Sequence, residues 1–170
     1  LGGARGDVLH AVDARAAEAG LRPGLRATAA QALCPGIELI ARSPAAEAAA
    51  RDALLVWSGQ FTSHAAALTD DCLVLEIGAS RRVFGGLDAL LDRLRLELAA
   101  LAHTVRLACA PTPDAAVLLA RHRPGAQVVA LDALPAALGP LPLRWLDVDP
   151  RLVERLHGLG SRTIGDCRRW

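Results

Sequence analysis

The stretch Cys72-Leu73-Val74-Leu75-Glu76-Ile77, followed by Phe84-Gly85-Gly86 and then by residues 87–101, decides the fold. The first run is apolar at almost every position, which predicts a strand. In residues 87–101 leucines recur at the i, i+3, i+4 and i+7 spacing of an amphipathic helix, and charged residues occupy the other face. A helix with one apolar face must pack on something, most simply a sheet.

Further strands and helices alternate on both sides of this stretch. Strand-like apolar runs lie at residues 8–12, 37–40, 105–109 and 127–130. Three helix starts are marked by a capping residue ahead of a proline, namely Ser43-Pro44, Thr112-Pro113 and Asp149-Pro150. The alternation predicts an α/β layer over about residues 45–131, with a turn at residues 20–24 before it and a linker at residues 138–142 after it.

The composition excludes several classes of protein. With 170 residues, 52% hydrophobic and 22% charged, the chain can bury a core and is not disordered. Nineteen basic residues against eighteen acidic ones leave a net charge of +1. A protein that coats a polyanion through overall charge is therefore excluded, and any nucleic-acid contact must come from a local patch.

Cysteine usage and polarity indicate the compartment. The four cysteines are far apart in the sequence and form no CxxC pair, so we expect reduced thiols inside the cell. The longest uncharged run, residues 53–69, is too polar to span a bilayer, and we expect a soluble, cytoplasmic protein. Because the chain has no methionine and starts at Leu1, we expect it to be a fragment.

Two aspartates and one basic segment are the candidates for chemistry. Asp70 and Asp71 stand at the entry to the strand, but a two-metal centre needs several carboxylates from different strands. By themselves they indicate a solvated strand start. Residues 151–170 hold five arginines against Glu154 and Asp166, and their glycines are typical of a turn that exposes amides to phosphates or of a helix end. This segment includes Arg155, Gly158, Gly160, Arg162, Arg168 and Arg169.

Six motifs, in order, resemble one family. They are Gly20-Leu21-Arg22-Pro23-Gly24, Ala32-Leu33-Cys34-Pro35, Leu73-Val74-Leu75-Glu76-Ile77, Phe84-Gly85-Gly86, Arg106-Leu107-Ala108-Cys109-Ala110-Pro111-Thr112-Pro113, and Leu159-Gly160 with Thr163-Ile164-Gly165-Asp166. Together they resemble the UmuC-like Y-family of translesion DNA polymerases, most of all its ImuB-type branch, whose members are regarded as DNA-repair proteins without polymerase activity. The resemblance covers nearly the whole chain.

The resemblance implies an architecture. Residues 1–43 are similar to the fingers of these polymerases. Residues 44–138 are similar to the palm, a sheet with helices on one face, but without its first strand. Residues 139–170 are similar to the start of the helix-hairpin-helix thumb. This α/β (α+β) arrangement agrees with the strands and helices expected from periodicity.

The resemblance also implies losses at the catalytic centre. Active members carry Ser-x-Asp-Glu-Ala where this chain has Thr69 to Leu73, so Asp71 keeps the aspartate and Cys72 replaces the glutamate. The tyrosine and arginine that hold the triphosphate in active members correspond to Ala14 and Ala17. The palm lysine falls near Ala116 or Val117, although Arg123-Pro124 keeps a neighbouring basic position.

The first thumb turn differs as well. Active members have Gly-hydrophobic-Gly at this turn, and the corresponding residues here are Asp147-Val148-Asp149. Two carboxylates repel backbone phosphates, so only the second element, around Gly160 and Arg162, keeps an expected phosphate contact. Asp149 has a structural explanation, because it precedes Pro150 as a helix cap.

The implied function is DNA repair and damage-induced mutagenesis, as part of the SOS response, by a protein that binds DNA weakly and non-specifically. The residues that we then expect to contact DNA are those of the basic C-terminal segment: Arg155, Gly158, Gly160, Arg162, Arg168 and Arg169. We expect no catalytic residue, no metal and no cofactor. The implied partners are a sliding clamp and an error-prone replicative-type polymerase, with association with the nucleoid. The alternative is a fragment of an active Y-family polymerase that uses Mg²⁺ and nucleoside triphosphates, in which Asp71 binds metal. A third interpretation is a broken gene product without a role.

Overall fold

The computed structural model describes residues 8–169, and the chain divides into two compact units, Leu1–Pro44 and Ala45–Trp170. In the first unit, helix α1 (Ala14–Glu18) begins after Asp13, whose carboxylate accepts from the amide of Ala16. Helix α2 (Ala27–Leu33) follows a turn in which Gly20 and Gly24 have φ near +87° and +86°. This left-handed backbone favours glycine, which confirms the turn expected at residues 20–24.

The strands predicted in the first unit are wrong or much shorter than expected. The run at residues 8–12 contributes only an isolated antiparallel bridge between Val8 and Arg26. Residues 37–40 form no strand, and Ile40 is 84% exposed. Apolar character alone did not make a strand here, because within residues 8–169 no segment pairs with residues 37–40 in a sheet.

The second unit contains one antiparallel hairpin, made of β1 (Ala65–Thr69) and β2 (Cys72–Leu75). Ala65 pairs with Leu75 and Thr69 with Cys72, with an irregularity between Ala67 and Thr69. The predicted strand at residues 72–77 is therefore confirmed up to Leu75. Strand β1 was not expected, because alanine is a poor strand former and its pairing with β2 decides its conformation.

The predicted strands at residues 105–109 and 127–130 are reduced to one parallel bridge. Cys109 pairs with Gln127, the amide of Cys109 donates to Ala126, and the amide of Val128 donates to Cys109, over 2.9 and 2.8 Å. The two segments do run side by side, but they are too short and too irregular to count as strands.

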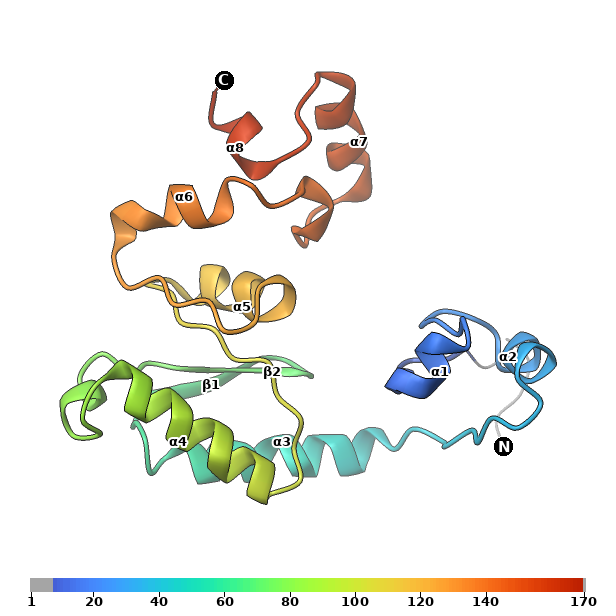
Figure 1. The fold of residues 1–170 in the computed structure, drawn as a ribbon, viewed down its shortest axis with the longest axis horizontal. Coiled ribbons are helices and arrows are strands. Elements are labelled where there is room, and N and C mark those ends of the chain that lie inside the picture. Colours follow the sequence, from blue (N-terminus) through green and yellow to red (C-terminus); the bar gives the residue numbers. More distant parts are fainter. Residues whose placement is uncertain (1–7, 170) are drawn as a thin grey trace. The chain divides into compact units, whose positions relative to one another are not determined.

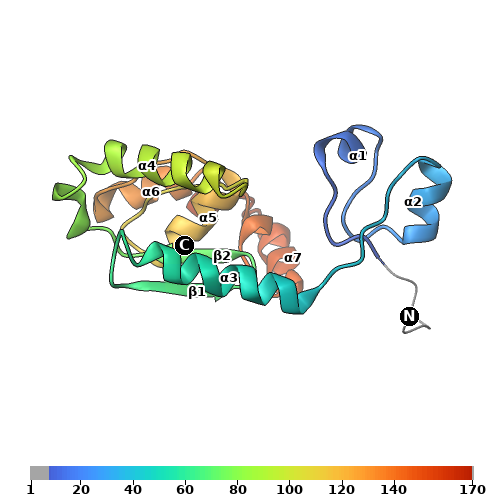
Figure 2. The same ribbon diagram turned by 90° about the horizontal axis from the view of Figure 1, so that it is seen from below.

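Nine helices and short helical turns make up the rest of this unit within residues 8–169 (Figures 1 and 2). In chain order they are α3 (Pro44–Ser58), η1 (Ser80–Arg82), α4 (Leu87–Ala100), α5 (Pro113–His122), η2 (Leu131–Ala133), α6 (Leu134–Leu138), η3 (Leu143–Trp145) and α7 (Pro150–Gly158), followed by α8 (Ile164–Cys167). The three predicted starts at Pro44, Pro113 and Pro150 are confirmed. Thr112 and Asp149 cap α5 and α7 through their side-chain oxygens.

Helix α4 forms the centre of the first core. Leu90, Leu91 and Leu94 are buried against Phe61 and the half-buried Leu75 of β2. The rings of Trp57 and Phe84 contact Phe61, with centroids 5.1 and 5.4 Å away. Trp57 of α3 packs against the same cluster, and Figure 2 shows α3 running alongside the hairpin. The amphipathic helix predicted at residues 87–101 is thus confirmed, and it packs as expected beside a sheet.

A second core joins α5 to the C-terminal helices. Leu119, Val128 and Leu141 are its buried members, and Ile164 of α8 packs against them. The ring of His122 stacks on Trp145, with centroids 4.2 Å apart and planes 4° apart. The boundary expected between residues 138 and 139 falls inside this core, and its assignment as a palm–thumb boundary stays a prediction.

Two glycines allow the backbones in this second core to approach closely. The amide of Gly165 donates to the carbonyl of Gly139 over 2.9 Å, and the amide of Ile164 donates to Leu141 over 2.9 Å. A Cβ atom added at Gly165 would lie 3.1 Å from the Gly139 oxygen. Absence of a side chain therefore lets α8 rest on the end of α6. None of the helices within residues 8–169 has the length and apolarity needed to cross a membrane.

Candidate functional site

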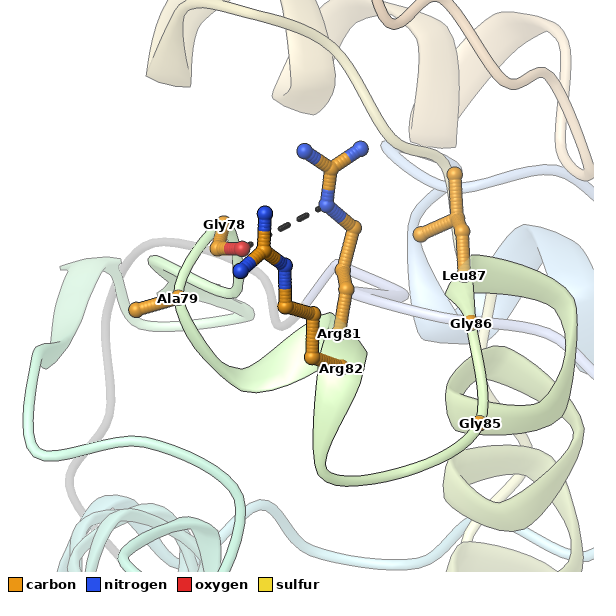
Figure 3. A pocket seen from close by; sticks show the side chains of 7 residues that line it. All are labelled: Gly78, Ala79, Arg81, Arg82, Gly85, Gly86 and Leu87. Atoms are coloured by element: carbon orange, nitrogen blue, oxygen red, sulfur yellow. Dashed lines mark hydrogen bonds between the residues drawn. The ribbon is translucent and has the colours of Figure 1, made fainter.

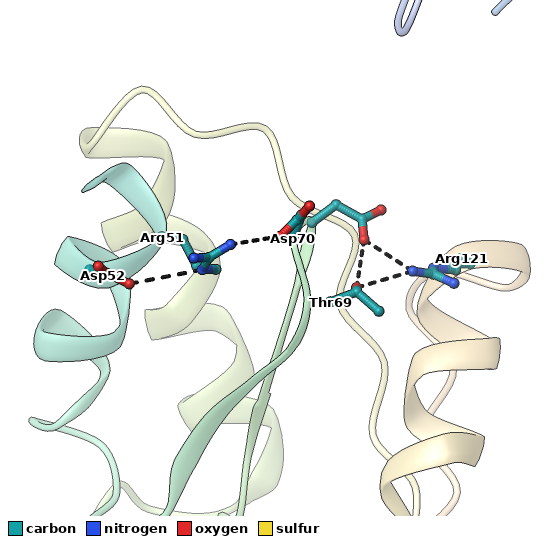
Figure 4. A network of polar contacts seen from close by, with 6 residues as sticks. Arg51, Asp52, Thr69, Asp70 and Arg121 are labelled. Carbon is teal, nitrogen blue, oxygen red and sulfur yellow. Dashed lines mark hydrogen bonds and ion pairs between the residues drawn. The ribbon is translucent and has the colours of Figure 1, made fainter. Parts of the chain in front are cut away.

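The two aspartates singled out in the sequence lie at the tip of the β1–β2 hairpin, and each is paired with an arginine. An oxygen of Asp71 accepts from the Thr69 hydroxyl over 2.7 Å and from the Arg121 guanidinium over 3.0 Å. Asp70 accepts from Arg51 over 2.8 Å. Figure 4 shows Arg51 of α3 reaching the tip from one side and Arg121 of α5 from the other. The tip is therefore tied to a helix on each side.

The pairing favours the ionised form of Asp71. The hydrogen bond from Thr69 lowers the pKa of this carboxyl most, the charge and hydrogen bond of Arg121 lower it further, and partial burial opposes them. The carboxylate is consequently charged at neutral pH. Because the side chain is exposed, solvent screens the ion pair, and its main effect is to orient the carboxylate rather than to stabilise the fold.

The neighbouring Cys72 is shifted toward its neutral, protonated form. Burial raises the pKa of its thiol above the usual value, and the charge of Arg121 only partly offsets this. The thiol is therefore protonated at neutral pH. Within residues 8–169, no three side chains of histidine, cysteine, aspartate or glutamate gather closely enough to hold a metal ion.

The alanines expected at triphosphate-binding positions lie on helices. Ala14 and Ala17 are exposed on α1, in the first compact unit. Ala116 and Val117 lie on α5. The basic residue kept nearby, Arg123, ends α5 and donates to the carbonyl of Ala137 in α6 over 3.2 Å. Its visible role is to connect these two helices.

The basic C-terminal segment folds into two helices around a glycine turn. Gly158 is the last residue of α7, and Gly160 has φ near +86° in the turn that follows. A capping box then begins α8, in which Thr163 accepts from the amide of Asp166 and Asp166 accepts from the amide of Thr163. The turn predicted by the glycines is thus built into the entry of α8.

The arginines of this segment differ in their surroundings. Arg155, Arg162 and Arg168 are exposed, whereas the guanidinium of Arg169 is ion-paired with Asp166. Asp166 also accepts from the backbone amide of Arg162 over 2.9 Å. These amides of Arg162 and Thr163 lower the pKa of the Asp166 carboxyl well below its usual range. The Asp166 carboxylate is therefore contacted by the Arg169 guanidinium and by the backbone of Arg162, whose side chain is exposed.

Thr69, Arg51 and Arg121 are residues of the hairpin-tip site that sequence reasoning missed. Arg121 lies 50 positions after Asp71, and Arg51 lies 19 positions before Asp70. No motif marks either arginine. The only available signal was the position of Thr69, two residues before Asp71, since a hydroxyl at that spacing can bond a turn carboxylate.

Comparisons with known proteins agree with these features. Residues 2–121 match the model of the impB/mucB/samB family. The protein ImuB of Caulobacter vibrioides, from strains NA1000 / CB15N and CB 15, is 34% identical over 146 residues. This match covers 86% of the chain and 32% of ImuB, so the chain spans about a third of the length of these curated relatives.

Solved structures show the same fold. The insertion ternary complex of Dbh DNA polymerase matches with a TM-score of 0.78 at 17% identity, over 93% of this chain and 47% of that one. DinB from Sulfolobus solfataricus matches with a TM-score of 0.72 at 17% identity, over 91% and 47%. The fold is that of a Y-family polymerase, as the motifs implied. By the match over residues 2–121 and by its ImuB relatives, the chain belongs to the impB/mucB/samB family.

Proposed function

We propose that this Y-family polymerase-like DNA-repair domain binds DNA but does not itself transfer nucleotides. The observation that carries the proposal is the pairing of Asp71 with Arg121 and Thr69 at the hairpin tip. By the resemblance of the motifs, Asp71 corresponds to a metal-binding aspartate of active members of the family. Here its oxygen faces a guanidinium and a hydroxyl.

The donor atoms at the tip support this proposal because they suit a magnesium pair poorly. Mg²⁺ prefers oxygen ligands in octahedral geometry, and two such ions need several carboxylates to neutralise them. Cys72 offers a protonated thiol, and the oxygen of Asp71 already accepts two hydrogen bonds. A magnesium ion bound to this oxygen of Asp71 would displace the Arg121 guanidinium and leave that charge without its carboxylate partner. We therefore propose that the domain uses no Mg²⁺ cofactor.

The proposed role is that of an adaptor in damage tolerance. A polymerase-like body that holds DNA without extending it can position other proteins there. By resemblance, these partners are a sliding clamp and an error-prone replicative-type polymerase, acting in the SOS response and mutagenesis on the cytoplasmic nucleoid. The similarity to ImuB over 86% of the chain supports this assignment.

Primer extension tests the absence of nucleotidyl transfer. The full-length protein, given primed template, Mg²⁺ and all four nucleoside triphosphates, is expected to extend no primer, because Asp71 and Cys72 do not supply a metal-binding pair. Dbh DNA polymerase in the same assay controls for the reaction conditions. Incorporation by the wild type that disappears in Asp71→Ala would contradict the proposal and would establish the alternative of an active, Mg²⁺-dependent polymerase.

DNA binding is the second part of the proposal, and the exposed arginines of the C-terminal segment support it. Arg155, Arg162 and Arg168 project from α7, the glycine turn and the end of α8. The guanidinium groups of such residues form bidentate contacts with phosphates. The matched Dbh structure is itself an insertion ternary complex of a DNA polymerase. We expect weak binding with little sequence preference.

Arg162→Ala is expected to make DNA binding less dependent on salt. If Arg162 neutralises one backbone phosphate, the slope of log affinity against log salt for duplex DNA falls in magnitude by about 0.9. Fluorescence anisotropy of the full-length protein with a mixed-sequence duplex at several salt concentrations measures this slope. The matched control is Arg95→Ala, because Arg95 lies on α4 and pairs with Asp92 over 2.6 Å. Equal slopes for Arg162→Ala and wild type would remove Arg162 from the interface.

A further inference from the structure

A hollow of about 650 Å³ lies between η1 and the start of α4, lined by residues 78–79, 81–82 and 85–87. It begins where β2 has ended and is therefore at the other end of this strand from Asp71. Figure 3 shows the side chains of Arg81 and Arg82 rising on the same side of the loop, with Leu87 across from them. We call this hollow the arginine pocket.

The two arginines give the pocket its charge. The Nε of Arg81 donates to the carbonyl of Gly78 over 3.4 Å, which holds the side chain upright and leaves its terminal nitrogens available. Arg82 is exposed. Within residues 8–169, neither guanidinium is ion-paired with a carboxylate, in contrast to Arg93 and Arg95 on α4. Two adjacent uncompensated guanidinium groups attract an anion.

The carboxylates nearest in sequence are engaged elsewhere. Glu76 accepts from the amide of Gly78 over 2.7 Å. Asp88, in the first turn of α4, accepts from the side-chain amide of Gln127 over 2.8 Å. Both therefore bond neutral donors rather than Arg81 or Arg82. These two carboxylates lower the positive potential of the pocket, but neither forms an ion pair with Arg81 or Arg82.

The backbone at the rim adds room for a bulky anion. Gly85 and Gly86 have φ near +80° and +117°, values that favour glycine, and no side chain from these positions covers the opening. Gly86, the residue before α4, makes no side-chain cap. The positive end of the dipole of this 14-residue helix therefore lies at the pocket. These features assist the arginine pair and are secondary to it.

We propose that the arginine pocket binds a backbone phosphate of a nucleic-acid strand, at a second contact separate from the C-terminal arginines. The lining favours the backbone over the bases, because it offers guanidinium groups for a phosphate and the apolar Ala79 and Leu87 for a sugar, with no aromatic ring on which a base could stack. This inference rests on the proposed DNA binding and extends the DNA path to the far end of the β2 strand.

The test compares the double variant Arg81→Ala/Arg82→Ala with the control Arg95→Ala in the full-length protein. If the pair neutralises one phosphate of duplex DNA, the double variant reduces the magnitude of the salt slope by about 0.9, and Arg95→Ala leaves it unchanged. The charge-conserving variant Arg81→Lys/Arg82→Lys is expected to keep the slope, since each lysine retains one charge. A slope equal to that of the wild type in the double alanine variant would overturn the proposal.

A titration with inorganic phosphate separates this proposal from the function on which it rests. Amide chemical shifts of Gly78, Gly85 and Gly86 are followed during addition of phosphate, with chloride at equal ionic strength as the reference. Saturable shifts that the double alanine variant loses, together with the reduced slope, support the assignment to a DNA phosphate. Saturable shifts with an unchanged slope would overturn it in favour of a small phosphate ligand. If Arg162→Ala alters the slope and the double variant does not, DNA binding stands and only this inference fails.

Discussion

Replacing Leu90 with alanine is expected to lower the free energy of unfolding by about 2–5 kcal/mol. Leu90 is 0% exposed and belongs to the cluster that joins α4 to Phe61 and β2. Truncation removes three carbons from this cluster and leaves a cavity that the surrounding rings of Trp57 and Phe84 cannot fill without losing their contacts with Phe61. Urea unfolding followed by far-UV circular dichroism measures the loss.

Leu96 provides the matched control on the same helix. It is 73% exposed, and Leu96→Ala makes the same chemical change at a site that buries little surface. We expect its free energy of unfolding to stay within about 0.5 kcal/mol of the wild type. Equal destabilisation by the two variants would mean that helix propensity, and not the buried cluster, determines the contribution of α4.

Gly165→Val is expected to lower the free energy of unfolding by about 1–3 kcal/mol. A Cβ at this position meets the backbone oxygen and Cα of Gly139 at 3.1 and 3.3 Å, and backbone atoms cannot rotate away as a flexible side chain would. Relief requires α8 to move from α6, which weakens the hydrogen bond between Gly165 and Gly139. The measurements are urea unfolding and the hydrogen exchange of the Gly165 amide, which is expected to become faster.

Gly158→Val controls for the effect of placing valine at a helical glycine. An added Cβ at Gly158 has nothing within 4 Å, so this variant should unfold within about 0.5 kcal/mol of the wild type. If Gly165→Val is as stable as Gly158→Val and its amide exchanges no faster, the close backbone approach does not hold α8 in place.

Features with a local cause could be predicted from the sequence. The leucine spacing of α4 and the capping residues Thr112 and Asp149 depend only on side chains within one or two helical turns. The glycines of residues 20–24 could be recognised for the same reason, because a left-handed backbone favours glycine wherever it occurs.

Features that depend on a distant partner could not be predicted in this way. Strand β1 begins with three alanines, which have little strand preference, and its pairing with β2 determines its conformation. Residues 37–40 show the converse, since their apolar side chains predicted a strand that finds no pairing segment in the described part of the chain. A strand needs a second backbone to satisfy its amides and carbonyls, and neither composition nor periodicity identifies that backbone.

Some features of the candidate site likewise follow from the sequence alone, and others depend on the packing of distant residues. The order of the motifs, the presence of Asp71 beside Cys72 and the basic character of residues 151–170 were properties of the sequence itself. Only the tertiary structure decided that Arg121, 50 positions away, is brought to Asp71. It likewise decided that Arg81 and Arg82 line a hollow in which no carboxylate of residues 8–169 pairs with them. Local preferences set where helices begin and which residue types are present, whereas the charge that each carboxylate or guanidinium meets depends on how the helices pack.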